Sequence, residues 1–165
     1  MSRKAIVWNS EDVILREISA EDAEQIVQWR ADPEVYRYFK NPHRITVEEH
    51  LFWFENVYLA DTNRLDFMVC TSEGLPVGTA SVKWEPETGD AEVSYLIGSN
   101  YRRQGWARRA VKALCAVAGE CWPVRNFTAV INKRNIASLE FIRALGFVPD
   151  KDEEPFQVFR KVAEH

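Results

Sequence analysis

The apolar residues of the chain fall into short runs whose spacing alternates between that of strands and that of helices. Runs rich in β-branched and aromatic residues predict buried strands at 13–18, 65–71, 77–84, 91–97 and 126–131. Turn-forming residues at 73–76 and 87–90 separate the middle three runs. We therefore expect 91–97 to be an antiparallel neighbour of the strand before it. The segments 147–148 and 156–159 are expected to close the chain as short strands.

Between these runs the chain carries the signals of helix starts and ends. The first helix covers about 19–31 and starts with Ser-x-x-Asp, and the second covers about 46–59 and starts with the capping box Thr-Val-Glu-Glu. A third helix covers 103–119, and a fourth covers 135–145 and ends at Gly146. The resulting order, β-α-α-β-β-β-α-β-α-β-β, predicts an α/β domain on a mixed sheet.

Composition and charge narrow the class of protein. The 165 residues, 46% hydrophobic and 28% charged, fit one domain over 1–165 with its core at about 10–160. A formal net charge of −4 argues against general nucleic-acid binding, which usually needs a broad basic face. The chain contains neither a signal-peptide-like start nor an apolar run of membrane-spanning length. We therefore expect a cytoplasmic protein without a membrane or nucleic-acid partner.

Three cysteines, Cys70, Cys115 and Cys121, each lie beside apolar residues. Buried free thiols are the favoured interpretation, ahead of a disulfide or a metal ligand. Neither Cys-x-x-Cys nor His-x-x-x-His occurs in the sequence, so we expect no metal site.

The segment 101–109, Tyr-Arg-Arg-Gln-Gly-Trp-Ala-Arg-Arg, concentrates four arginines in an acidic chain. It joins a predicted strand to a predicted helix, and the start of a helix has backbone N–H groups without intrahelical partners. These donors, the helix dipole and the arginines together predict a phosphate or pyrophosphate site. A merely solvated loop is the alternative. The segment matches neither a Walker loop nor the Gly-x-Gly-x-x-Gly of a dinucleotide fold.

Two motifs carry a resemblance to a known superfamily. Arg102, Gly105 and Ala107 match a loop signature of Arg or Gln, two residues, Gly, one residue, then Gly or Ala. The segment Asn135-Ile-Ala-Ser138, followed by Leu145-Gly146-Phe147, matches a second signature in the same relative place. The chain thus resembles the GNAT superfamily of acyl-CoA-dependent N-acetyltransferases over about residues 10–160. This resemblance implies a mixed, mostly antiparallel sheet with a splayed central strand pair flanked by helices.

The resemblance also implies a binding site for acetyl-CoA. The strand through Tyr95-Leu96-Ile97 would splay from 126–131, and its backbone would hold the pantetheine arm like an added strand. Asn135 and Ser138 would face the pantetheine and the thioester, and Asn135 also suits a helix N-cap. The pyrophosphate would lie on the loop residues Arg102, Arg103, Gln104, Gly105, Trp106, Ala107 and Arg108.

The implied reaction is direct attack of an amine on the acetyl thioester. An alkylammonium group has an ordinary pKa of about 10, so a base or a water chain must remove a proton. Glu92, on the central strand, is the first candidate, and a solvent-facing carboxylate is its alternative. Many relatives protonate the leaving thiolate with a tyrosine seven residues after the motif asparagine. Here that position is Ile142, so Ser138 is the substitute candidate.

In this superfamily the choice of acceptor amine depends mostly on the segment corresponding to 20–60. Here that segment is similar to two branches, the ribosomal-protein N-terminal acetyltransferases and the nucleotide-linked aminosugar acetyltransferases of the pseudaminic-acid pathway. Arg30 could pair with an acceptor phosphate or carboxylate, His50 could hydrogen-bond the acceptor or assist proton transfer, and Trp53 could stack on a ring. The alternatives are a surface pair of Arg30 with Asp32 and packing roles for His50 and Trp53.

The leading hypothesis is an acetyl-CoA-dependent N-acetyltransferase acting, as a monomer or homodimer, on a small-molecule or peptidic amine. Because Ile142 stands where many relatives have a tyrosine, a non-catalytic acyl-CoA-binding module is the alternative hypothesis. A nucleotide-phosphate enzyme is disfavoured because the sequence has no Mg²⁺-binding motif.

Overall fold

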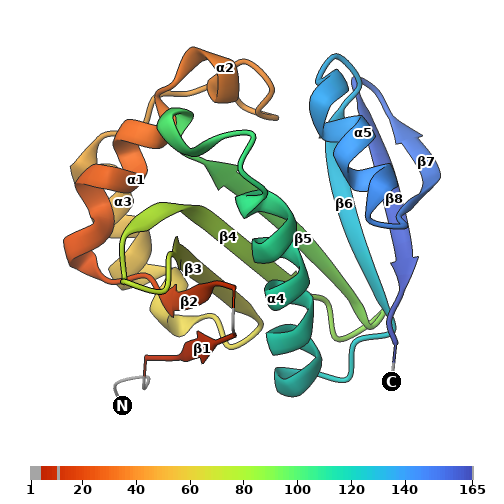
Figure 1. The fold of residues 1–165 in the computed structure, drawn as a ribbon, viewed down its shortest axis with the longest axis horizontal. Coiled ribbons are helices and arrows are strands. Elements are labelled where there is room, and N and C mark those ends of the chain that lie inside the picture. The colour runs from red at the N-terminus through yellow and green to blue at the C-terminus, as the bar shows by residue number, and fades with distance from the viewer. Residues whose placement is uncertain (1–4, 11, 165) are drawn as a thin grey trace.

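The computed structural model describes residues 5–10 and 12–164, which form an eight-stranded sheet with helices on both faces (Figure 1). The strand order is β1-β2-β3-β4-β5-β6-β8-β7, and only β5 and β6 among these described neighbours run parallel. The mixed, mostly antiparallel α/β fold is therefore confirmed. The strands are β1 (Val7–Asn9), β2 (Ile14–Glu17), β3 (Arg64–Cys70), β4 (Pro76–Trp84), β5 (Asp90–Ile97), β6 (Asn126–Asn132), β7 (Val148–Glu153) and β8 (Phe156–Val162).

The helices divide between the two faces of the sheet, because successive strand residues point to opposite sides. Phe67 and Val69 of β3 belong to the core under α4 and α5, whereas Met68 and Cys70 pack with α1 and α3. Three single-turn 3-10 helices lie at 20–22, 58–60 and 99–101. The α-helices are α1 (Ala23–Arg30), α2 (Pro33–Tyr36), α3 (Val47–Asn56), α4 (Trp106–Cys121) and α5 (Ile136–Ala144).

Local sequence signals set the ends of the helices that border the site. The predicted capping box is present at α3, where the Glu49 N–H donates to Thr46 Oγ1 at 3.1 Å and the Thr46 N–H donates to Glu49 Oε1 at 3.2 Å. After α5, Gly146 adopts a φ of +92°, a conformation that costs glycine little. Both termini agree with the sequence-based predictions.

The central strands separate along their length, as the sequence resemblance implied. β5 and β6 are in register only at Asp90–Asn126, Ala91–Phe127 and Glu92–Thr128. Beyond these pairs, β5 stays bonded to β4 as far as Ile97, and β6 stays bonded to β8 as far as Asn132. The two halves of the sheet therefore diverge, and backbone groups of both strands face the gap between them.

Some short elements and one cysteine differ from the predictions. β1 has only three residues, and α2 is a single turn whose N-cap, Asp32, accepts a hydrogen bond from the Glu34 N–H at 3.0 Å. The sequence pattern placed a helix end at Asp32-Pro33, although proline also suits the first turn of a new helix. Cys121 is exposed at the solvent-facing end of α4, so its predicted burial is wrong. Within the described residues, no helix combines the length and the apolar character that crossing a membrane requires.

Gly78 of β4 lies so close to β5 that a side chain there would collide with backbone. A Cβ atom at this position would be 2.2 Å from the Leu96 carbonyl oxygen and 3.0 Å from the Cα of Ile97. We expect Gly78→Ala to lower the free energy of unfolding by about 1–3 kcal/mol, measured by urea denaturation. Gly119→Ala is the matched control: its Cβ would have nothing within 4 Å, and it should stabilise α4 by about 0.5–1 kcal/mol. An unchanged unfolding free energy for Gly78→Ala would contradict the close approach.

Candidate active site

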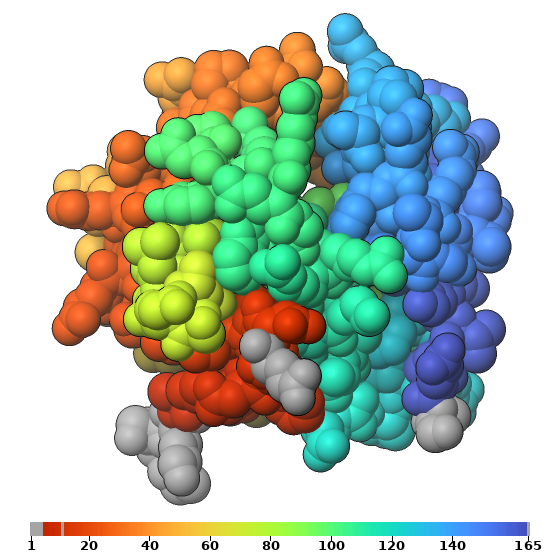
Figure 2. Space-filling view, viewed as in Figure 1, coloured from red at the N-terminus to blue at the C-terminus, as the bar shows by residue number. Residues whose placement is uncertain are grey.

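The gap between β5 and β6 is a cleft of about 900 Å³. Figure 2 shows it as a hollow between the green atoms that precede and begin α4 and the blue atoms of α5. Its lining comes from five places: most of residues 34–39 at and after α2, β5 at 93–97, most of the segment 101–108, the end of β6, and α5 with the residues that flank it. The cleft thus brings together both motifs on which the sequence resemblance depends.

One end of the cleft is formed by the start of α4. Gly105 occupies the N-cap position with φ +83°, and a Cβ added there would meet only Arg109 Nη2, at 3.9 Å, so the backbone is accessible from outside. The first N–H groups of the helix have no intrahelical acceptor, and they point out of its positive end. Trp106, Ala107 and Arg108 contribute these groups and line the cleft. This arrangement fits a pyrophosphate.

The arginines of the loop have different surroundings. Arg102 donates from Nη2 to Asp32 Oδ2 at 2.8 Å and from Nε to the Ile97 carbonyl at 3.2 Å, so its side chain fixes the loop to the turn after α1. The Glu34 N–H bond and, to a smaller extent, Arg102 lower the pKa of Asp32. Arg103 and Arg108 are exposed and line the cleft, where their charges are available to an anion.

The Trp106 side chain, at the start of α4, contacts one residue of the loop and one of the helix. Gln104 accepts a hydrogen bond from Trp106 Nε1 at 3.3 Å, and it does not line the cleft. The Arg109 guanidinium lies 4.4 Å from the centroid of the Trp106 ring.

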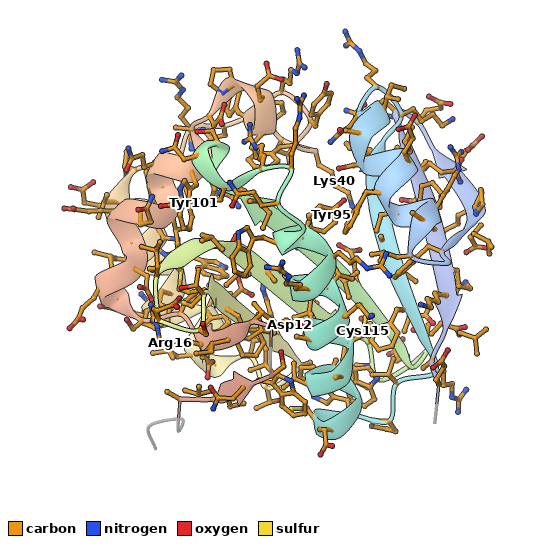
Figure 3. All side chains as sticks on the ribbon, in the orientation of Figure 1. Asp12, Arg16, Lys40, Tyr95, Tyr101 and Cys115 are labelled. Carbon is orange, nitrogen blue, oxygen red and sulfur yellow. The ribbon has the colours of Figure 1, made fainter. Side chains whose placement is uncertain are left out.

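The other end of the cleft is formed by α5 and by one tyrosine of β5. The Asn135 side chain caps α5 by accepting from the Ser138 N–H at 3.3 Å, as predicted. The Tyr95 side chain lies between β5 and α5 (Figure 3). Its hydroxyl donates to Ser138 Oγ at 3.1 Å, and its ring meets the Phe141 ring edge-on, with 5.0 Å between the centroids. Burial raises the pKa of Tyr95 to about 12, so the phenol stays protonated at neutral pH. Two hydroxyl groups therefore lie together where the strands separate.

A second cavity, of about 480 Å³, lies on the opposite side of β5; we call it the acceptor pocket. Its floor is a cross-strand row, Asp66, Ser81 and Ser94, in which the two serine hydroxyls are 2.6 Å apart. Its walls come from α1, α3 and the segment between α2 and α3. The full lining is Ile18, Ile26, Arg30, Phe39, Ile45, Glu49, His50, Trp53, Arg64, Asp66, Thr79, Ala80, Ser81, Ser94, Tyr95 and Leu96.

The three residues predicted to bind the acceptor all line this pocket. Arg30 lies over the Phe39 ring at 4.8 Å, and Trp53 lies 5.5 Å from His50 between ring centroids. Burial and, to a smaller extent, Arg30 lower the pKa of His50, so its imidazole is neutral at pH 7. The alternative of an Arg30–Asp32 surface pair is wrong, because Asp32 pairs with Arg102.

The cleft and the acceptor pocket meet on β5. Phe39, Ser94, Tyr95 and Leu96 are the residues that line both cavities. A molecule lying along the cleft and a molecule in the pocket would therefore approach each other beside Tyr95.

Two other residues singled out in the sequence, Glu92 and Ile142, do not line the junction. Glu92 is exposed on β5, in register with Lys83 and Thr128, and lines neither cavity. Ile142 is completely buried in the core, so its position presents no group to the cleft. The sequence reasoning missed Phe39 and Arg64 as pocket residues, because their spacing gave no sign of the face that they would line.

The candidate site thus consists of a helix start with free N–H groups, a gap between two strands and a separate polar pocket beside that gap. A family model described as an acetyltransferase (GNAT) domain matches residues 12–148, and the chain belongs to this family. The resemblance seen in the sequence is thereby confirmed.

Three individual proteins illustrate the likeness. The uncharacterized protein MJ1062 of Methanocaldococcus jannaschii is 27% identical over 145 residues, which are 84% of this chain and 28% of that protein, so the chain spans well under two thirds of it. RimL, a ribosomal L7/L12 α-N-protein acetyltransferase solved with coenzyme A, has a TM-score of 0.80 at 15% identity, covering 95% of this chain and 98% of its own.

The spermidine N-acetyltransferase of Vibrio cholerae, solved with coenzyme A and spermine, has a TM-score of 0.81 at 14% identity, covering 93% of this chain and 97% of its own. At such identities the two solved structures share the fold. Both of those structures hold coenzyme A. For this chain, the match to the acetyltransferase (GNAT) family supports acetyl-CoA as the predicted cofactor.

Proposed function

We propose that this chain transfers the acetyl group of acetyl-CoA to a primary amine held in the acceptor pocket. The observation that carries the proposal is the junction of the two cavities at Ser94-Tyr95-Leu96. A thioester at the end of the cleft and an amine in the pocket can meet only there. Holding two reactants in contact lowers the barrier of a bimolecular step by several kcal/mol, about 7–11 in favourable cases.

The residues of the cleft would hold the donor by distinct means. Backbone groups of Tyr95-Leu96-Ile97, which β6 leaves unpaired, would bind the pantetheine amides like an added strand. The N–H groups of Gly105–Arg108 and the exposed side chains of Arg103 and Arg108 would bind the pyrophosphate. Arg102 would act mainly by fixing the loop, because its guanidinium already bonds to Asp32.

In the transfer step the amine nitrogen forms a bond to the acetyl carbon, and the carbon–sulfur bond breaks. Glu92 is the proposed base; since it lies two residues before Ser94, about 7 Å along the strand, a water molecule would relay the proton. His50, neutral inside the pocket, is the other candidate for this role. The departing thiolate would receive hydrogen bonds from Tyr95 and Ser138, whose hydroxyls lie at the same end of the cleft.

The acceptor in this proposal is a nucleotide-linked aminosugar, a peptide N-terminus or another amine that fits the pocket. The polar row Asp66, Ser81 and Ser94 and the aromatic walls from Phe39 and Trp53 suit an amine attached to a polar body. A cytoplasmic location and a monomeric or homodimeric state stay predictions.

The test is to measure coenzyme A release from acetyl-CoA over a panel of aminosugars, peptides and polyamines, with product masses to identify the acetylated nitrogen. Turnover that depends on the amine, with an N-acetyl product, is the expected result. Calorimetry with coenzyme A runs in parallel. Tight binding without turnover on any amine would overturn the enzymatic proposal in favour of an acyl-CoA-binding module, the alternative that the buried Ile142 supports.

A further inference from the structure

The acceptor pocket contains two buried nitrogen atoms for which the described residues supply no hydrogen-bond partner. These are Nε of Arg30, at the end of α1, and Nε2 of His50, on α3. His50 is only 5% exposed, and both side chains line the pocket. Unpaired buried donors are costly, and in a cavity they indicate a ligand that supplies acceptors.

Arg30 also forms no ion pair of its own with a described residue, although the Asp66 carboxylate is near enough to act on its charge. Two carboxylates share the pocket, but each has another partner. Asp66 receives bonds of 2.8 and 3.2 Å from Arg64, and Glu49 pairs with His43 at 3.0 Å. Arginine keeps its charge in proteins, so an anion is the partner that this pocket favours.

We propose that Arg30 and His50 bind an oxyanion of the acceptor, which is therefore a small anionic amine carrying a carboxylate or a phosphate group. The inference rests on the proposed function only for the statement that the ligand is the acetyl acceptor. The stacking of Arg30 on Phe39, at 4.8 Å, fixes its plane, which favours the two-point binding that guanidinium gives to carboxylates and phosphates.

The same geometry excludes a class of acceptors. A polyamine would place a second ammonium group beside Arg30, where like charges repel. An anionic amine instead directs its anion to α1 and α3, which leaves its amino group toward Ser94 and Tyr95 at the junction. His50 adds a neutral donor, because its imidazole carries no charge at pH 7.

The experiment compares primary amines in matched pairs. Each pair contains an amine with an anionic group and a close analogue without it: L-phenylalanine and its amide, 2-aminoethyl phosphate and 2-aminoethanol, and glycyl peptides and their amides. Spermidine is added as a polycationic amine. We expect kcat/KM to be about 10- to 100-fold higher for the anionic member of the preferred pair, the range typical of a hydrogen bond to a charged group. The first two pairs distinguish a carboxylate from a phosphate.

Variants at one position connect this preference to Arg30. Arg30→Gln should abolish the preference by lowering kcat/KM much more for the anionic member than for the neutral member. Arg30→Lys should keep part of the preference for anionic amines, because lysine has the positive charge of arginine but not its planar guanidinium group. Arg44→Gln is the control, because Arg44 is exposed and lines neither cavity. Coenzyme A affinity and thermal unfolding check that each variant is folded.

Direct binding separates this inference from the proposed function. Calorimetric titration of the coenzyme A complex with the same amines, by wild type and Arg30→Gln, needs no turnover. Anion-dependent binding without turnover would keep this inference and contradict the enzymatic proposal. A wild type that prefers neutral amines or spermidine, binds no member of the panel, or keeps its anion preference in Arg30→Gln would overturn the inference.

Discussion

Replacing Gly105 by glutamate is expected to weaken coenzyme A binding at least about 100-fold, as measured by calorimetry. Gly105 caps α4 with φ +83° and lines the cleft beside the free N–H groups of the helix start. A glutamate there would place a negative charge where we propose the pyrophosphate binds. Two like charges about 4 Å apart repel by about 4 kcal/mol near a protein surface, and each ~1.4 kcal/mol is a factor of ten in affinity.

Gly105→Gln is the matched control for this prediction. It adds a side chain of the same length and the same left-handed backbone strain, without the charge. We expect it to lose about 30-fold or less in affinity, since a non-glycine residue at positive φ costs roughly 1–2 kcal/mol. Equal losses in the two variants would show that strain, rather than repulsion, weakens binding. Wild-type affinity in Gly105→Glu would disprove the placement of the pyrophosphate.

Removing the Tyr95 hydroxyl should lower kcat on the order of 100-fold while coenzyme A affinity stays nearly unchanged. The hydroxyl lies 3.1 Å from Ser138 Oγ at the end of the cleft, and phenylalanine would keep the ring contact with Phe141. With a pKa of about 12, Tyr95 cannot readily give its proton to a thiolate whose thiol has an ordinary pKa of about 8.5. It would act by hydrogen bonding the developing charge, and loss of one such donor typically costs 100-fold or more.

The pH dependence of kcat distinguishes this role from that of a titrating acid. Because burial raises the pKa of Tyr95, the phenol stays protonated up to about pH 12. Tyr95→Phe should therefore lower the whole profile between about pH 6 and 10 without moving its inflections. Tyr36→Phe, at a tyrosine that lines neither cavity, is the control. A kcat within about threefold of wild type for Tyr95→Phe would leave Ser138 as the proposed donor.

Much of the fold follows from short-range patterns in the sequence. The capping box at Thr46, the stop at Gly146 and the alternation in β3, β4 and β5 all act within a few residues, so their elements were predicted within a few positions. The short elements β1 and α2 were missed because too few residues form them for a period to show. β1 is held by pairing with β2, and α2 by the bond from Arg102 to its N-cap, Asp32.

The two halves of the candidate site differ in how far the sequence predicts them. The donor half is one continuous loop and helix start, so its arginines, glycine and helix appear together in the sequence. The acceptor pocket is assembled from several separate segments, and no spacing shows that Arg30 and His50 face the same space. The contact of Tyr95 with Ser138, 43 residues away, depends on the α4 crossover that places α5 beside the cleft.

The bond between Arg102 and Asp32 has a consequence for how each of the two ligands affects the affinity for the other. Asp32 follows Arg30 by two residues, and Gly98, at the end of β5, lies so close to Trp29 of α1 that an added Cβ would be 2.7 Å from its indole nitrogen. We therefore expect the donor loop and the end of α1 to move together. A donor that tightens this loop would change acceptor affinity, and thermodynamic reciprocity requires the acceptor to change donor affinity by the same factor.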